Sequence, residues 1–254
     1  MAILRLVTRA DDAGLNRPTN RAIRASVKRG IVRNVSVMAT TGDIEDAAAS
    51  LGDLEGVVDF GFHVCLTSEW RDPRFRPLAE VRGLTRDDGT FAAMVEELAT
   101  FAPDPNEVTA EVAAQYERLI DSGFTLSYLD EHMRIGEVAG IADVLTDFAK
   151  DHGLVYDRTL QNALVIQSLP DWEGPGPHPG TELADHLSEV PSGTYLIVGH
   201  PGFKSDDIVR LRLDSGAEDD FVLSRNRERR MFADIEIVDY CENARVKLLR
   251  YSEL

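Results

Sequence analysis

The sequence has little cysteine and no long apolar run. Its two cysteines, Cys65 and Cys241, lie far apart among the 254 residues and lack the short spacing of a metal-binding motif. This excludes a disulfide framework and favours a reducing compartment. No apolar stretch is long enough to span a bilayer, and Arg5 and Arg9 interrupt the first apolar run too early for a signal peptide. We expect a cytoplasmic protein without a membrane partner.

Positive charge is also scarce. Lys and Arg number 27 against 44 Asp and Glu, which leaves a formal net charge of −17. Such a protein repels the phosphates of nucleic acids and of anionic membranes, so we expect neither as a partner. A neutral or cationic small substrate suits this charge better. Hydrophobic residues at 43% are ample for a core, and the length suits a single α/β barrel domain over residues 1–254.

Apolar periodicity predicts an alternation of strands and helices. We expect strands at residues 3–7, 31–38, 57–66, 126–129, 154–159, 195–199 and 245–249, and helices at 20–28, 44–51, 107–122, 138–150 and 228–237. The alternation implies parallel strands joined by right-handed crossovers. Residues 67–90 are rich in Arg, Asp, Pro and Gly, so we predict a lid or loop insertion at 67–100.

Two adjacent carboxylates, Asp11 and Asp12, end the first apolar strand. Burying both is costly unless a cation lies beside them. A divalent metal held by one carboxylate, with the other free to accept a proton, would meet that need. The alternative is that Asp12 caps the next helix while Asp11 is solvated, since Asp is common in turns and at helix N-termini.

Histidines lie at the ends of three further strands. Period-two alternation places His63 on the small, polar face of its strand, opposite an apolar face. His132 follows Asp130 after the next apolar strand, and His200 begins a His-Pro-Gly sequence after residues 195–199. Taken singly, these are a structural histidine, a helix start and a turn. Jointly they indicate one site, because parallel strands bring their C-terminal ends to one rim.

Several motifs occur in a fixed order along the chain. They are Ala10-Asp11-Asp12-Ala13-Gly14 with Asn20, Gly61 to Thr67, Leu84 with Gly89 and Phe91, Glu111 with Gln115, Gly123, Asp130-Glu131-His132, and His200-Pro201-Gly202. In this order the chain resembles the YdjC-like carbohydrate deacetylase family, which includes the chitooligosaccharide deacetylases. The resemblance covers nearly the whole chain.

This resemblance implies a distorted TIM-like (β/α) barrel that hydrolyses the acetamide of an N-acetylated sugar or oligosaccharide and releases acetate and a free amine. It implies one divalent metal ion on Asp12, His63 and His132, with Asp11 as the general base and His200 as the general acid. The family metal is usually Mg²⁺, although two imidazole ligands suit Zn²⁺, Co²⁺ or Ni²⁺ at least as well. A homodimer is a family-level expectation.

Four positions depart from the family pattern. Arg9, Ala13, Cys65 and Arg134 stand where the family usually has Asn, Phe, Asn and a second His. We expect Arg134 to raise the positive potential near the metal, and therefore to favour a sugar that carries a carboxylate or a phosphate.

Two more residues are candidates for the substrate site. Cys65 shares the face of His63, although a buried thiol that fills the interior is the commoner outcome. Arg158 follows a predicted strand and either orients Asp11 or forms a surface ion pair.

Two other functions are open to such a chain. A sugar isomerase or aldolase commonly uses a Lys or Glu base inside its barrel, but Lys is scarce here and absent from these strand ends. A catalytically silent relative would bind a carbohydrate or a partner protein and would need neither a base nor an acid. The presence of both Asp11 and His200 therefore favours the hydrolase.

Overall fold

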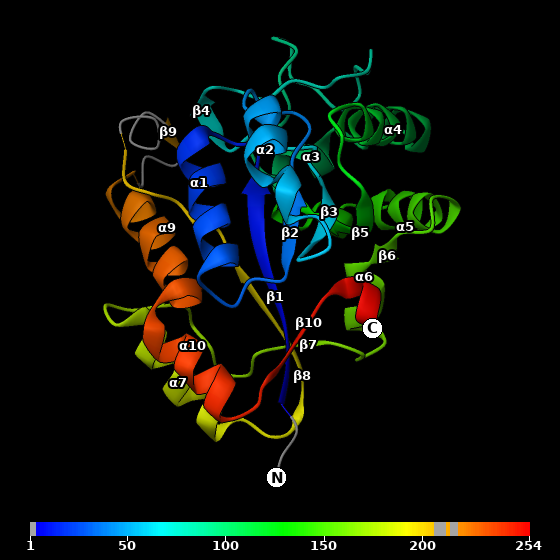
Figure 1. Cartoon of the computed structure of the whole chain (residues 1–254). Coiled ribbons are helices and arrows are strands. Elements are labelled where there is room, and N and C mark those ends of the chain that lie inside the picture. The colour runs from blue at the N-terminus through cyan, green and yellow to red at the C-terminus, as the bar shows by residue number, and fades with distance from the viewer. Residues whose placement is uncertain (1–3, 206–211, 214–217) are drawn as a thin grey trace.

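The computed structural model describes residues 4–205, 212–213 and 218–254 (Figure 1). One parallel sheet forms its centre, with the strand order β6-β5-β3-β2-β1-β8-β7. The strands are β1 (Leu4–Ala13), β2 (Asn34–Val37), β3 (Asp59–Val64), β5 (Leu126–Glu131), β6 (Val155–Tyr156), β7 (Gln167–Ser168) and β8 (Gly193–Gly199). The short strands β6 and β7 are its two edges, so the curled sheet is a half-barrel that does not close. The predicted α/β, TIM-like class is confirmed.

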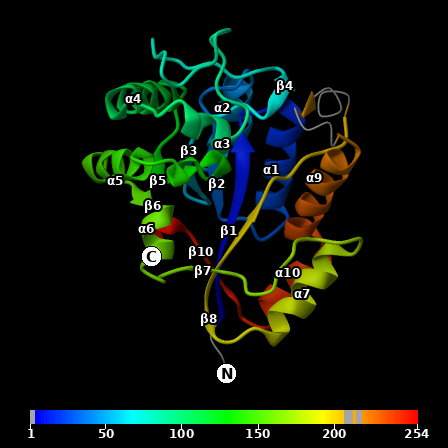
Figure 2. The same ribbon diagram turned by 180° about the vertical axis from the view of Figure 1, so that it is seen from behind.

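A further strand, β10 (Lys247–Leu249), pairs with the first half of β1. On the same side, β2 pairs with the second half of β1 from Arg9 onward. Beyond β10 the chain bends toward the interior of the half-barrel, where Tyr251–Glu253 forms a short 3-10 helix. Figures 1 and 2 both show this C-terminus beside α6 (Asp157–Asn162).

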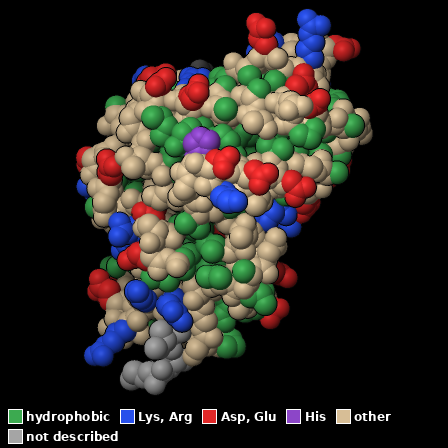
Figure 3. Space-filling view, turned by 90° about the vertical axis from the view of Figure 1, so that its right-hand side faces the viewer, with side chains coloured by type: hydrophobic (Ala, Val, Ile, Leu, Met, Phe, Trp, Pro, Cys, Tyr) green, Lys and Arg blue, Asp and Glu red, His purple; other side chains and the backbone are tan. Residues whose placement is uncertain are grey.

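Helices cover the outer face of the sheet (Figure 2). Five helices pack in series on one side, in the order α7 (Pro179–Glu189), α10 (Ile235–Asn243), α9 (Glu218–Ala233), α1 (Arg17–Lys28) and α2 (Ile44–Leu51). On the other side, α4 (Pro105–Asp121) packs on α5 (Ile141–Asp151). Local signals begin two of these helices. The Asn16 side chain caps α1 by accepting from the Thr19 amide, and Asp104 caps α4 in the same way. Acidic side chains are scattered over the face in Figure 3, as the net charge of −17 requires.

Several predicted element boundaries are wrong. The strand predicted at 3–7 continues to Ala13 as β1, and two other differences have clear physical reasons. The helix predicted at 228–237 is two helices, of which α9 begins ten residues earlier, at Glu218. The apolar residues of the extra turns, Phe221 to Leu223, are consecutive and do not repeat at helical spacing, so periodicity does not detect a helix there. The strand predicted at 154–159 ends at Tyr156, because Asp157 begins α6. From its sequence we predict that the acidic run 214–220 is a solvated loop, and this run lies partly outside the described residues.

The segment 67–100, predicted as a lid or loop insertion, is folded against the sheet and helix α4. It contains β4 (Trp70–Asp72), which pairs antiparallel with β9 (Arg212–Leu213), and the helix α3 (Val95–Thr100). Glu111 of α4 accepts hydrogen bonds from the amides of residues 78 and 79, at 2.8 to 3.1 Å. Leu84 and Phe91, two side chains of the segment 67–100, are fully buried. Among the described residues, no helix is both long enough and apolar enough to cross a bilayer.

Candidate metal centre and active site

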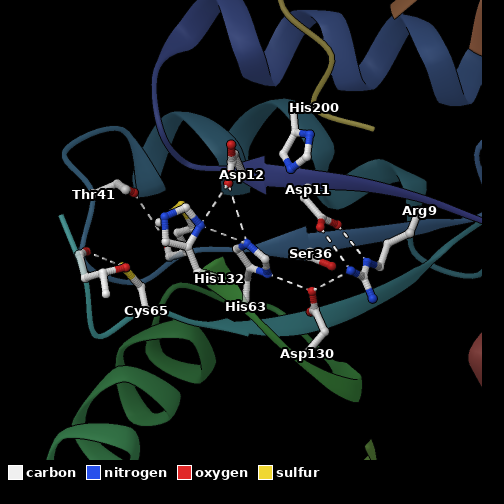
Figure 4. A network of polar contacts seen from close by, with 12 residues as sticks. Arg9, Asp11, Asp12, Ser36, Thr41, His63, Cys65, Asp130, His132 and His200 are labelled. Carbon is white, nitrogen blue, oxygen red and sulfur yellow. Dashed lines mark hydrogen bonds and ion pairs between the residues drawn. The ribbon is translucent and has the colours of Figure 1, made fainter. Parts of the chain in front are cut away.

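Three strands deliver a carboxylate and two imidazoles to one point of the C-terminal rim (Figure 4). Asp12 lies in β1, His63 in β3, and His132 directly after β5. The Asp12 Oδ1 atom is 3.5 Å from both His63 Nε2 and His132 Nδ1, and these two nitrogens are 3.3 Å apart. All three side chains are buried. The predicted convergence is therefore present, and the group could hold a metal ion.

The spacing of these atoms fits a shared cation. Two ligand atoms that each lie about 2.1 Å from an ion at a tetrahedral angle are about 3.4 Å apart. The second imidazole nitrogen of each histidine also faces a carboxylate: His63 Nδ1 is 2.7 Å from Asp130 Oδ2, and His132 Nε2 is 3.0 Å from Glu69 Oε2. Such carboxylates orient metal-binding histidines and make them stronger ligands.

The backbone of β1 explains how two neighbouring carboxylates reach the same site. Side chains of adjacent residues in a regular strand point to opposite faces. Here the pairing of β1 with β2 shifts between Ala10 and Ala13, so two residues of β1 oppose one of β2. Asp12 takes a positive φ of 67°. This bulge turns Asp12 toward the histidines, while Asp11 still points into the half-barrel (Figure 4).

Asp11 is held by Arg9, two residues before it on β1. The guanidinium makes a bidentate contact, with Nε 2.8 Å from Oδ1 and Nη2 3.1 Å from Oδ2. Burial raises the pKa of the Asp11 carboxyl, but Arg9, His63 and His200 together outweigh the effect of burial, and the net shift of the pKa is downward. Asp11 is therefore an ionised, oriented proton acceptor. Sequence reasoning recorded Arg9 only as a departure from the family pattern.

His200 follows β8 and lies beside Asp12 and above Asp11 in Figure 4. Its Nδ1 is 3.0 Å from Glu228 Oε2, and Glu228 also accepts hydrogen bonds from the His200 amide and, at 2.7 Å, from the Ser224 hydroxyl. Burial lowers the pKa of His200, but the Glu228 carboxylate outweighs it and the net shift is upward. The imidazole thus keeps its proton to higher pH than a free histidine.

One face of α9 supplies several of these contacts. Phe221, Ser224, Arg225 and Glu228 recur at helical spacing and line the same cavity. Arg225 Nη1 is 2.7 Å from Asp12 Oδ2, and its guanidinium lies 4.5 Å from the centre of the Phe221 ring. Burial opposes ionisation of Asp12, but Arg225 and the two imidazoles hold the pKa of Asp12 well below its usual range. The spacing 221-224-225-228 was the signal that could have found this face.

The cavity over the site has a volume of about 1380 Å³, and its wall includes Arg134 and Arg158. Of the two roles open to Arg158 the ion pair is the one present, because its Nη2 is 2.7 Å from Glu131 Oε2 and it makes no contact with Asp11. Arg134 pairs with Glu137 at 2.7 Å, and its side chain is 79% exposed. What either does to a substrate stays a prediction.

Cys65 does not belong to the cavity wall, which corrects its predicted place in the substrate site. The side chain is fully buried, and the thiol donates a hydrogen bond to the Thr67 carbonyl at 3.1 Å. Gln115 of α4 holds the amide and the carbonyl of Cys65 at 3.1 and 2.7 Å. Burial raises the pKa of the thiol to about 11, so it is an inert packing group.

Metal affinity is expected to rise with pH. Burial by itself lowers the pKa values of His63 and His132. The carboxylates beside the two imidazoles raise these pKa values by more than burial lowers them. The pKa of His63 is raised to about 9, and that of His132 lies well above its usual value. Below these values protons occupy the nitrogens that a metal needs, so binding must displace them. We expect affinity to increase roughly tenfold per pH unit for each displaced proton between about pH 6 and pH 9.

Calorimetry in buffers of different ionisation enthalpy measures the released protons directly. Equal affinity at both ends of that range, with no proton release, would contradict the assignment of these imidazoles as ligands.

The fold and the buried group define the class of the protein: a parallel α/β half-barrel with a candidate metal centre at its C-terminal rim. The family model described as YdjC-like protein matches residues 5–243, so the chain belongs to the YdjC-like family. The resemblance predicted from the sequence motifs is confirmed.

Individual relatives are distant, and they match from about two thirds of the chain to nearly all of it. A carbohydrate deacetylase of Clostridium beijerinckii is 21% identical over 266 residues, covering 99% of this chain and 100% of its own. A chitooligosaccharide deacetylase of Escherichia fergusonii is 28% identical over 167 residues, covering 65% of this chain and 63% of its own. A crystal structure from Enterococcus faecalis V583, named for cellobiose-phosphate cleavage, matches with a TM-score of 0.79 at 18% identity over 99% of both chains. The structural match supports the fold alone.

Proposed function

We propose that this protein is a metal-dependent carbohydrate deacetylase that hydrolyses the acetamide of an N-acetylated sugar to acetate and a free amine. One observation carries the proposal. The buried Asp12–His63–His132 group lies beside an ionised carboxylate, Asp11, and an imidazole, His200, whose pKa is raised. Amide hydrolysis needs these components together: a cation site, a base for water and an acid for the nitrogen. The names of the two relatives support this choice of reaction.

A divalent ion bound to Asp12, His63 and His132 would supply Lewis acidity toward the amide carbonyl and lower the pKa of water. Asp11 accepts the proton of the attacking water, because Arg9 keeps it ionised and oriented. His200 then donates a proton to the departing nitrogen, so that the product leaves as an amine rather than as its anion. Mg²⁺ is the family expectation, and Zn²⁺, Co²⁺ and Ni²⁺ suit the two imidazoles.

The charges of the cavity favour a neutral sugar. Nine carboxylates and five guanidinium groups line it. The guanidinium of Arg134 is paired with Glu137 and largely exposed, so its charge is compensated and screened. This argues against the expectation that Arg134 selects acidic sugars. We propose a neutral N-acetylated mono- or oligosaccharide as the substrate.

Acetate release tests the reaction. The chain is treated with a chelator and reloaded singly with Mg²⁺, Zn²⁺, Co²⁺ or Ni²⁺, and each form is given neutral and acidic N-acetylated sugars of one to several units. We expect release only from metal-loaded protein, with neutral sugars preferred. Stoichiometric metal binding without acetate release from any sugar would overturn the proposal and favour a catalytically silent relative.

The substitution Glu228→Gln is expected to shift the alkaline limb of the pH profile of kcat to lower pH. The Glu228 carboxylate raises the pKa of His200, and the general acid must be protonated to act. Without that carboxylate the imidazole loses its proton at lower pH, so activity falls more at pH 8 than at pH 6. Glu137→Gln removes a carboxylate that pairs with Arg134 rather than with His200, and serves as the control. An unchanged alkaline limb in Glu228→Gln would contradict the role of His200.

A further inference from the structure

A single buried guanidinium joins four side chains beneath the proposed base. Besides its bidentate contact with Asp11, Arg9 places Nη2 3.3 Å from Asp130 Oδ2 and Nη1 3.0 Å from Asp157 Oδ2. Its Nη1 also donates to the Tyr251 hydroxyl at 3.0 Å. These partners come from β1, the end of β5, the start of α6 and the C-terminal turn. Arg9 therefore contacts four separate parts of the half-barrel.

The partners of Arg9 are themselves fixed. The Tyr251 hydroxyl donates to Asp157 Oδ1 at 2.7 Å, so it presents its lone pairs to Arg9. The Tyr251 ring stacks on Tyr128 with centroids 4.1 Å apart, and its amide donates to Asn34 Oδ1 at 3.0 Å. All of these groups are buried. The guanidinium plane is therefore set by groups that cannot move independently.

Asp11 depends on that plane more than the other two carboxylates do. Asp130 is also bonded to His63, and Asp157 also accepts from Tyr251. For Asp11, both side-chain hydrogen bonds found within the described residues come from Arg9. An Arg–carboxylate fork fixes the plane of the carboxylate as well as its distance, which a Lys point charge cannot do.

We propose that Arg9 is the positioning residue of the base, and that Asp157 and Tyr251 hold it in place, so that the C-terminal turn forms part of the catalytic support. The inference rests on the proposed function, in which Asp11 takes the proton of water. It also explains why Arg9 can stand at a position where the family pattern has Asn: the chain has Asp157 and Tyr251 to receive the longer, charged side chain.

Two variants test this inference. Arg9→Lys keeps the charge and loses the fork, and we expect kcat to fall about 100-fold with little change in KM, because misplacing a reacting group by about 1 Å costs that much. Tyr251→Phe keeps the ring on Tyr128 and loses one hydroxyl, and we expect kcat to fall about fivefold. The controls are Arg24→Lys, in an exposed fork with Asp53, and Arg250→Lys, beside Tyr251 in the same turn.

Rates are expressed per bound metal ion, and the melting temperature is recorded for each variant. A merely structural role would lower the melting temperature while kcat per metal-loaded molecule stays within twofold of the unsubstituted chain, and that result overturns the inference. Crystal structures of the metal-loaded variants give a second readout that needs no turnover. We expect the Asp11 carboxylate to rotate in Arg9→Lys.

An unchanged Asp11 in that crystal structure overturns the positioning role whether or not acetate is released. The opposite outcome is also informative. If Asp11 is rotated in Arg9→Lys while the unsubstituted protein releases no acetate from any sugar, the proposed function is overturned and the positioning role stands.

Discussion

Replacing Asp11 by Asn is expected to lower kcat for acetate release by roughly 10²- to 10⁴-fold, the usual contribution of a general base. The amide has the shape of the carboxylate but cannot accept the proton of water. Metal binding should persist, because Asp12, His63 and His132 are unchanged and Asp130 and Asp157 still hold Arg9. Steady-state kinetics together with the metal content of the purified variant measure both effects.

The matched control for Asp11→Asn is Asp53→Asn, which changes an exposed carboxylate that also receives an Arg fork. It should leave kcat within twofold of the unsubstituted chain. A metal-loaded Asp11→Asn protein that retains a tenth or more of kcat would show that another group takes the proton of water.

Replacing His63 by Ala is expected to abolish metal binding at micromolar concentrations, and with it acetate release. The variant removes one of three ligand atoms and leaves Asp130 without its imidazole partner, as a buried carboxylate. Removing only the supporting carboxylate, by Asp130→Asn, should weaken metal affinity less, by about 10- to 100-fold. Calorimetry with Zn²⁺ or Co²⁺ orders the two variants.

His152→Ala is the control for His63→Ala. His152 lies at the end of α5, where its ring stacks on Phe148 with centroids 3.9 Å apart, and it does not line the cavity over the proposed metal centre. Metal affinity should be unchanged in this variant. Equal affinities in His63→Ala and His152→Ala would remove His63 from the metal centre.

The convergence of Asp12, His63 and His132 could be predicted because it follows from strand polarity. Each residue lies at or near the C-terminal end of a strand, and parallel strands present all their C-terminal ends at one rim. The sheet needed for this was predictable from the alternation of strand and helix patterns, and most element boundaries agree within a few residues. Strand and helix periods are local properties, so they are visible in a linear sequence.

The partners of these residues could not be predicted in the same way. Glu69 lies in the segment predicted as a lid, yet it bonds to His132 because that segment packs on the rim. Arg225 and Glu228 lie on α9, whose first apolar residues do not repeat at helical spacing. Long, flexible side chains reach partners in many directions, so their pairing depends on how the helices pack.

By itself, the amino-acid sequence determined the parallel α/β class, the strand-end carboxylates and imidazoles, and the family. Only the tertiary structure decided that Arg9, rather than Arg158, holds Asp11, that Cys65 is packing, and that Glu228 supports His200. The physical reason is that the positions of strands and helices, and the face that each buries, are set by short-range apolar patterns. The orientation of a charged group is set instead by neighbours that come together only when distant parts of the chain are packed.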